Sequence, residues 1–233
     1  MSKGLRTRDL PKWIKKGIES AFTEWLDMSG EWLNSAPEYM VTMHIAQQLK
    51  KNVDPKQRTI FMEPSVSKIL YEAGGIQRGP NAEVLRTTGR YDIVIGHKDL
   101  RPRAVIEVKS PMWHPMATPM IADLHRLCKT LLQNKDGTQI HSALMAIYVP
   151  SRTPRRKDET AKSRLSRKWV DQMPDALKKC EWAKGKKATY LKNLTFKTHT
   201  HLHDHRVGDE TYAWGSVCIE ITRKTPSQKK KDI

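Results

Sequence analysis

Two short apolar segments joined by a polar turn constrain the fold of this chain more than any other feature. RYDIVIGH (Arg90–His97) and RAVIEVKS (Arg103–Ser110) are rich in Val and Ile, and KDLR followed by Pro102 separates them. Val and Ile favour strands, and a short polar linker between two such segments predicts an antiparallel hairpin. The few charged residues inside these apolar segments are therefore the first candidates for a functional site.

The hairpin can be given a register. A turn centred between Asp99 and Leu100 places Asp92 opposite Glu107, and opposed residues have Cβ atoms roughly 4.5–5.5 Å apart. Two carboxylates that close repel each other unless a cation or a proton is present. Strand alternation puts Lys109 on the same face as Glu107, about 6.6 Å along the strand. The three residues predict a divalent-metal site with a lysine that orients or deprotonates water, or stabilises phosphate charge.

Hydrophobic spacing predicts the remaining elements. A helix is expected over residues 12–33, and a second helix after Ser35, where Glu38 three residues on would complete a capping box. Further elements are expected as follows: a strand or helix within Ile60–Ile69, a loop at Gly74–Pro80, a helix over Met120–Gln133, a buried strand over Ser142–Pro150, a helix around Trp169–Leu177, and strands over Thr198–Val207 and Tyr212–Thr222.

The charge of the chain favours a polyanionic partner. The 233 residues carry a net charge of +17, with basic stretches at 152–168 and 178–197, and such a surplus binds nucleic acid through phosphate neutralisation. No apolar run near 18 residues and no signal-peptide pattern occurs, so no membrane partner and a cytoplasmic location are expected. Cys128, Cys180 and Cys218 are odd in number and widely spaced, which is typical of free thiols.

The charged residues of the hairpin also carry a family resemblance. Asp92 in YDIVIGH, followed by Glu-x-Lys at the end of AVIEVKS, resembles the PD-(D/E)xK nuclease superfamily. The resemblance implies that Asp92 and Glu107 bind metal, with the Val108 carbonyl as an extra ligand, and that Lys109 is catalytic. A preceding helix often supplies another Glu, which Glu38 in APEYMVTMHIAQQL matches best, and the helix IADLHRLCKTLLQ fits the one that follows.

The resemblance covers roughly residues 35–150, and Tyr91 stands where the family name has Pro. It implies a three-layer α/β/α restriction-endonuclease-like core with a mixed central sheet. The expected organisation is an N-terminal helical segment at 1–34, a nuclease domain at 35–222 and a basic disordered tail at 223–233.

The implied activity is Mg²⁺- or Mn²⁺-dependent hydrolysis of phosphodiester bonds in DNA. Restriction or anti-phage defence is a setting suggested by fold association alone. A double-strand cut by one site per chain would call for a homodimer or a partner subunit. Two alternatives stay open: a catalytically silent nucleic-acid-binding or assembly module of the same fold, and an RNase.

Several candidate residues have a structural interpretation beside the functional one. Glu38 fits a capping box as well as a site, and Glu63 and Glu31 are weaker candidates for its role. Trp113 is interpreted as core packing in preference to a substrate contact, and His114 and His125 as structural. The alternating row from His199 to His205 could bind zinc, but without a cysteine pair a polar strand face near phosphates is preferred.

Overall fold

The computed structural model describes residues 7–74, 88–115, 118–133, 140–151, 160–173, 192–207 and 210–224. The helices are α1 (Leu10–Ser29), α2 (Glu38–Asn52), α3 (Val66–Glu72), α5 (Thr118–Leu132) and α6 (Ala161–Ser166), with short turns η1 (Thr7–Asp9), η2 (Leu33–Ser35) and η3 (Arg167–Asp171). The strands are β1 (Arg58–Met62), β2 (Ile93–His97), β3 (Pro102–Lys109), β4 (Ser142–Ser151), β5 (Leu194–Val207) and β6 (Glu210–Arg223).

The six strands form one mixed sheet in the order β1-β2-β3-β4-β6-β5. β3 and β4 run parallel, and the other neighbouring strands are antiparallel. α5 connects the two parallel strands, as a crossover between parallel neighbours requires. The chain is therefore a mixed α/β protein with a mixed sheet.

The predicted hairpin register is confirmed over most of its length. Ile93 pairs with Ile106 and Ile95 pairs with Ala104, the partners that a turn between Asp99 and Leu100 requires. The register then shifts by one residue at Gly96, which pairs with Pro102. This irregularity lies at the turn, so it leaves the partners at the other end of the hairpin unchanged.

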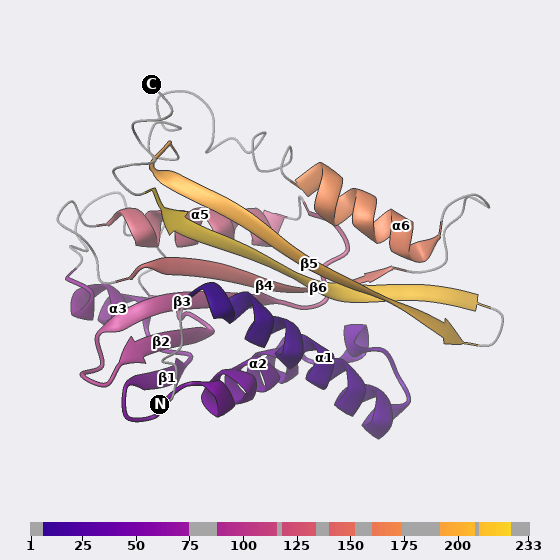
Figure 1. Cartoon of the computed structure of the whole chain (residues 1–233), viewed down its shortest axis with the longest axis horizontal. Helices are drawn as coiled ribbons and strands as arrows, with labels where there is room; N and C mark the ends of the chain where they lie inside the picture. The colour runs from indigo at the N-terminus through magenta and orange to yellow at the C-terminus, as the bar shows by residue number, and fades with distance from the viewer. Residues whose placement is uncertain are drawn as a thin grey trace.

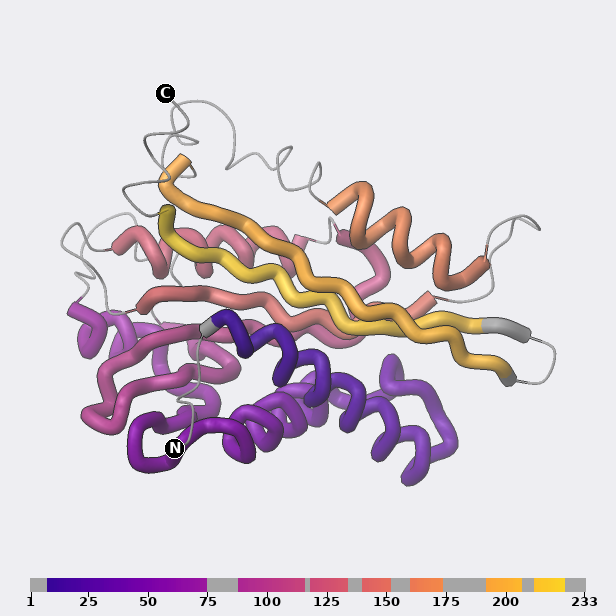
Figure 2. The backbone as a smooth tube through the Cα atoms, in the orientation of Figure 1, coloured from indigo at the N-terminus to yellow at the C-terminus, as the bar shows by residue number. Residues whose placement is uncertain are grey.

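Helices cover both faces of the sheet (Figure 1). Alternation along β2 and β3 sends Val94 and Val105 into a core with α3, α5 and α6. Ile93 and Ile106 point the other way, into a core with α1 and α2. The backbone trace shows α1 running beneath the long β5–β6 hairpin (Figure 2). Three layers result, with the sheet in the middle.

α1 and α2 pack closely because a glycine lies at their crossing. A Cβ atom on Gly17 would lie 2.5 Å from the Cα atom of Ile45 in α2, so a larger residue would push the helices apart. α1 ends at Gly30, whose φ of 69° is the left-handed conformation that favours glycine at helix ends. The helix predicted over 12–33 is thus correct in kind but ends earlier.

The capping box predicted at Ser35 is wrong. α2 begins at Glu38 with Pro37 at the cap position, and no side chain caps it. Pro37 disfavours helical geometry at the preceding Ala36, which has ψ of 150°. The Ser35 hydroxyl instead donates to the carbonyl of Trp32 and accepts from the indole of Trp25. Glu38 is therefore not a capping residue for Ser35.

The elements beyond the hairpin mostly agree with the sequence. The helix over Met120–Gln133 and the buried strand over Ser142–Pro150 are confirmed as α5 and β4, and the two C-terminal strands as β5 and β6. The region predicted as strand or helix near Ile60 contains both β1 and α3. The helix expected around Trp169–Leu177 begins earlier, at Ala161, and residues 174–177 lie outside the described residues.

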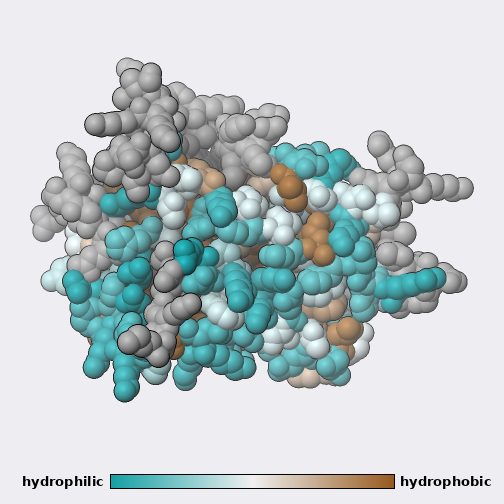
Figure 3. Space-filling model, viewed as in Figure 1, coloured by the Kyte–Doolittle hydropathy of each residue, from teal (hydrophilic) through white to brown (hydrophobic). Residues whose placement is uncertain are grey.

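Several predictions fall partly or wholly outside the described residues. These are most of the Gly74–Pro80 loop, residues 152–159 and 178–191 of the two basic stretches, Cys180, and the tail beyond Lys224. Arg223, expected to begin the tail, is instead the last residue of β6. No helix in the described part of the chain is long and apolar enough to span a bilayer. Hydrophilic side chains predominate among the coloured residues of the face in Figure 3, above all in its lower left part.

Candidate active site

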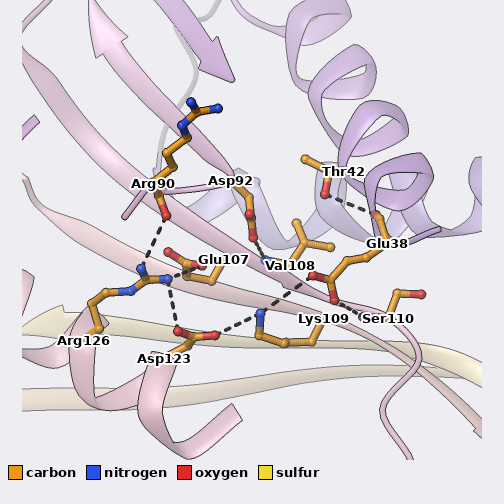
Figure 4. Close-up of polar contacts among 10 residues, drawn as sticks. All are labelled: Glu38, Thr42, Arg90, Asp92, Glu107, Val108, Lys109, Ser110, Asp123 and Arg126. Carbon is orange, nitrogen blue, oxygen red and sulfur yellow. Dashed lines mark hydrogen bonds and ion pairs between the residues drawn. The ribbon is translucent and has the colours of Figure 1, made fainter. Parts of the chain in front are cut away.

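The structure brings the four predicted site residues together at the carboxyl end of β3 (Figure 4). Glu107 and Lys109 lie in β3, and Asp92 directly precedes β2. Glu38, the first residue of α2, reaches the same place from a helix on the other face of the sheet. A pattern read from two strands and a distant helix thus converges on one small region.

Asp92 is fixed by the backbone of the neighbouring strand. It lies one residue before the first paired residue of β2, so it is not itself part of the ladder. Its Oδ2 atom accepts a hydrogen bond of 2.6 Å from the backbone N–H of Val108. Val108, predicted to offer its carbonyl to a metal, therefore has an observed role through its amide, while the carbonyl contact stays a prediction.

Glu107 is held in the interior by an arginine. Its side chain is 2% exposed, and its Oε2 atom lies 2.7 Å from Nη2 of Arg126 in α5. The second oxygen, Oε1, is buried and has no hydrogen-bond partner. A buried carboxylate oxygen without a donor is costly, because it has lost its water without a replacement. Such an atom is suited to receive a cation.

The side chain of Lys109 is held in position by two carboxylates. Its Nζ atom lies 2.9 Å from Oδ2 of Asp123 in α5 and 3.9 Å from Oε1 of Glu38. The other oxygen of Glu38 accepts a hydrogen bond of 2.8 Å from the backbone N–H of Ser110. Glu38 therefore ties the start of α2 to the end of β3, and the ammonium group is held between two helices.

Asp123 and Arg126 complete the network, and the sequence reasoning missed both. Asp123 is 4% exposed in its side chain and contacts both Lys109 and Arg126, the latter at 3.1 Å. The Arg126 guanidinium also lies over the ring of Tyr91, 5.6 Å from its centroid. The Tyr91 hydroxyl shares a hydrogen bond of 2.6 Å with Thr130 of the same helix. α5 is thus connected to the hairpin by polar side chains on its buried side.

Burial raises the pKa of every acidic residue predicted in the site. Burial raises the pKa values of Glu38, Asp92 and Glu107, and the effect on Glu107 is the largest. Arg126 opposes the rise at Glu107, while the charge of Asp92 adds to it. Removing these carboxylates from water without a full set of partners is the physical cause. A bound cation would reverse the balance.

Burial and the neighbouring carboxylates shift the pKa of Lys109 in opposite directions, and the carboxylates have the larger combined effect. Desolvation lowers the pKa of the ammonium group, whereas the nearby Asp123 and Glu38 carboxylates raise it, and the net direction is upward. Lys109 is therefore a cation at neutral pH, a donor of hydrogen bonds and not a base.

The donor set fits a hard divalent cation. Asp92 has one oxygen bound to an amide, and Glu107 has an unpartnered oxygen beside it. Within the described residues no group of three or more His, Cys, Asp and Glu side chains is placed to hold a metal. Mg²⁺ needs fewer protein ligands than that, because it keeps several waters and takes one or two carboxylates plus phosphate oxygens. Two carboxylates are sufficient for such a site.

The weaker acidic candidates lie elsewhere. Glu63 has φ of 49° and pairs at 3.0 Å with Arg90, while Glu31 lines a separate cavity. The prediction of Trp113 as a core residue is wrong, since the residue is 41% exposed and belongs to neither core cluster. The loop that carries Trp113 leaves the sheet at the end of β3, so its ring has no core to enter.

The histidine row lies on β5 and packs against other elements. His199 contacts Glu220 at 3.1 Å, and His203 contacts Glu19 of α1 at 3.0 Å while stacking on Trp214. His205 lies edge-on to Phe22. These contacts give the row a packing role between the β5–β6 hairpin and α1.

Comparisons with known proteins provide no relative for this chain. No family model, no curated protein and no solved structure matches it.

Proposed function

We propose that this protein is a metal-dependent endonuclease that hydrolyses phosphodiester bonds in DNA. The observation that carries the proposal is the convergence of Asp92, Glu107 and Lys109 at one end of β3, with a buried Glu107 oxygen that has no donor. A hard cation held by carboxylates beside a protonated lysine can activate water and stabilise the negative charge that develops on a phosphodiester during hydrolysis.

The arrangement of elements supports a restriction-endonuclease-like fold. The resemblance implies a helix that supplies a Glu, a strand hairpin that supplies the acidic and lysine residues, and a helix after the Glu-x-Lys strand. α2, the β2–β3 hairpin and α5 stand in that order, and helices cover both faces of the mixed sheet. The order and layering are consistent with the fold proposed from the motif.

The residues take distinct roles in the proposed reaction. Asp92 and Glu107 would hold Mg²⁺ or Mn²⁺, which when bound lowers the pKa of a water and polarises the phosphoryl oxygen. Lys109, held as a cation by Asp123 and Glu38, donates to the attacking water or to a phosphate oxygen and stabilises negative charge in the transition state. Glu38 acts through Lys109 and Ser110, so it is a positioning residue.

A cleavage assay tests the proposal. Supercoiled plasmid incubated with the protein and Mg²⁺ or Mn²⁺ should be nicked or cut, and EDTA should abolish cleavage. Glu107→Gln should reduce the rate by at least about 100-fold, since it removes a proposed metal ligand. Equal cleavage by this variant would refute the site. DNA binding without cleavage under every divalent metal would indicate a silent module, and cleavage of RNA alone would indicate an RNase.

The cleavage rate should also depend on pH in a way set by the buried carboxyl groups. The pKa values of Asp92 and Glu107 are raised, so protons compete with the metal for these carboxylates at a higher pH than they would for exposed carboxylates. We expect the rate at subsaturating Mg²⁺ to fall as pH decreases while still above about 4.5, the unperturbed range. Raising the Mg²⁺ concentration should move this acidic limb to lower pH. If the acidic limb does not move with Mg²⁺ concentration while circular dichroism shows an intact fold, the assignment of these carboxylates as metal ligands is contradicted.

A further inference from the structure

A cavity of about 430 Å³, separate from the candidate active site, is lined by three aromatic residues. Its walls include Trp32, Trp113 and Tyr212, with Asn34 and Glu31 among its polar members. Cavities of a few hundred Å³ with apolar walls and a few polar groups are the usual sites for planar small molecules.

The cavity is connected to the site by two short pieces of chain. Trp113 is four residues beyond Lys109, which limits their Cα separation to about 14 Å. On the other wall, Asn34 is four residues before Glu38, whose carboxylate binds the Ser110 amide. A stacked strand rises about 3.4 Å per nucleotide, so the cavity is within a few nucleotides of the proposed cleavage point.

One wall of the cavity is a rigid aromatic surface. The Trp32 ring is held edge-on to Phe22 with centroids 5.7 Å apart, and it lies 5.1 Å from the ring of Tyr212. The ring of His205 also contacts Trp32 edge-on, with ring centroids 5.3 Å apart. A ring fixed in this way loses little freedom when a planar group stacks on it, which favours binding.

Trp113 lines the same cavity from a loop whose backbone is held by hydrogen bonds. The N–H of Met112 donates to the carbonyl of Tyr148 at 3.0 Å, and Lys168 donates to the carbonyl of Trp113 at 3.3 Å. As a residue, Trp113 is 41% exposed. Lys168 also places a positive charge beside the loop, as the phosphate next to a bound base would need.

The polar groups of the cavity suit a base and not a phosphate. Glu31 would repel an anion, whereas its carboxylate can accept from the exocyclic amino group of a base. Within the part of the chain that the structure describes, the side chains of Asn34 and Glu31 have no hydrogen-bond partner, although Ser35 between the two walls is already bonded. The amide and carboxylate are available for the edge of an unpaired base.

We propose that this cavity, which we name the aromatic pocket, binds one unstacked nucleobase carrying an exocyclic amino group, near the site of cleavage. This inference rests on the proposed function and specifies its substrate as nucleic acid with an unpaired nucleotide close to the scissile bond. Stacking on the Trp32 and Trp113 rings supplies the affinity, and Glu31 disfavours thymine and uracil, which lack the amino group.

The test measures binding in EDTA, so that it does not depend on cleavage. Full-length protein is titrated with a fluorescein-labelled octamer of deoxycytidine and with a fully paired duplex. Trp113→Ala should weaken binding of the octamer by about 5- to 150-fold, the range for loss of one stacked base, and leave the duplex almost unchanged. Trp113→Phe should retain most of the affinity. Glu31→Gln should reduce the preference for deoxycytidine over deoxythymidine octamers.

Tyr71→Ala is the matched control, because this tyrosine is 80% exposed on α3 and does not line the pocket. Unchanged octamer binding by Trp113→Ala, or an equal loss on the duplex, would overturn the proposal. Failure of the proposed function looks different. If Trp113→Ala weakens octamer binding but the protein cuts no DNA with any metal, the aromatic pocket stands and the nuclease proposal fails. If Glu107→Gln abolishes cleavage but Trp113→Ala binds the octamer normally, the nuclease proposal stands and the aromatic pocket fails.

Discussion

Replacing Lys109 with alanine is expected to slow cleavage by about 10²- to 10⁴-fold, while DNA affinity changes only a few-fold. Its ammonium group is held by Asp123 at 2.9 Å and Glu38 at 3.9 Å, so it has a fixed position at the end of β3. A charge held there acts on the transition state more than on bound substrate, because negative charge on the phosphate is redistributed as the bond breaks. Single-turnover rates with Mg²⁺ and binding constants with Ca²⁺ separate the two effects.

Two further variants make the test of Lys109 specific. Lys68→Ala, which removes a lysine 68% exposed on α3, should leave the rate unchanged. Asp123→Asn should slow cleavage less than Lys109→Ala, since it frees the ammonium group from its closest partner but keeps the charge. A rate loss matched by an equal loss of DNA affinity would mean that Lys109 binds the phosphate backbone and does not act in the chemical step.

The hairpin shows how much of the site follows from local sequence. Strand alternation and a short turn were sufficient to place Asp92 beside β3 and to put Glu107 and Lys109 on one face, and the observed pairing agrees from Ile93 to Ile95. Side chains that alternate with a period of two leave few registers that bury the apolar face. This part of the site was predictable because it depends on neighbours in the chain.

Residues on α5 were missed because their role depends on tertiary packing. The buried apolar face of this helix includes Leu124 and Leu127, yet Asp123 and Arg126 are buried beside them at 3% and 4% exposure. Their spacing of three residues places both on one side of the helix. A signal existed: charged residues adjacent to an apolar stripe, at helical spacing, opposite a strand that carries Glu107. The pairing itself could be found only once the helix lay on the sheet.

Glu38 illustrates the opposite error, in which a local motif competed with a distant contact. Ser-x-x-Glu predicts a capping box, but Pro37 delays the start of α2 to Glu38 and the carboxylate reaches Ser110 instead. The contact joins residues far apart in sequence, and no local pattern encodes it. The same holds for Trp113, whose apolar side chain favoured a core position that the loop after β3 does not offer.

Replacing Arg126 with alanine is expected to destabilise the fold by about 3–5 kcal/mol in the absence of divalent metal. The guanidinium is 5% exposed in its side chain and contacts Glu107 and Asp123 at 2.7 and 3.1 Å. Its removal leaves the buried carboxylates of Glu107 and Asp123 without the cation that they share, and an uncompensated buried charge is costly. Arg101→Ala is the matched control: its ion pair with Asp99 is solvent-exposed, so the free energy of unfolding should stay almost unchanged.

Mg²⁺ should restore much of the stability that Arg126→Ala loses, and this links the fold to the proposed metal. A cation bound at Glu107 supplies the charge that Arg126 provided, and a ligand that binds only the folded state stabilises it in proportion to its affinity. The thermal midpoint of Arg126→Ala should therefore rise more with Mg²⁺ than that of the wild type. Adding Glu107→Gln should remove the response, because the ligand is then gone. If Mg²⁺ shifts the wild type and Arg126→Ala equally, the cation does not bind at Glu107, and the carboxylate that Arg126 neutralises has only a structural role.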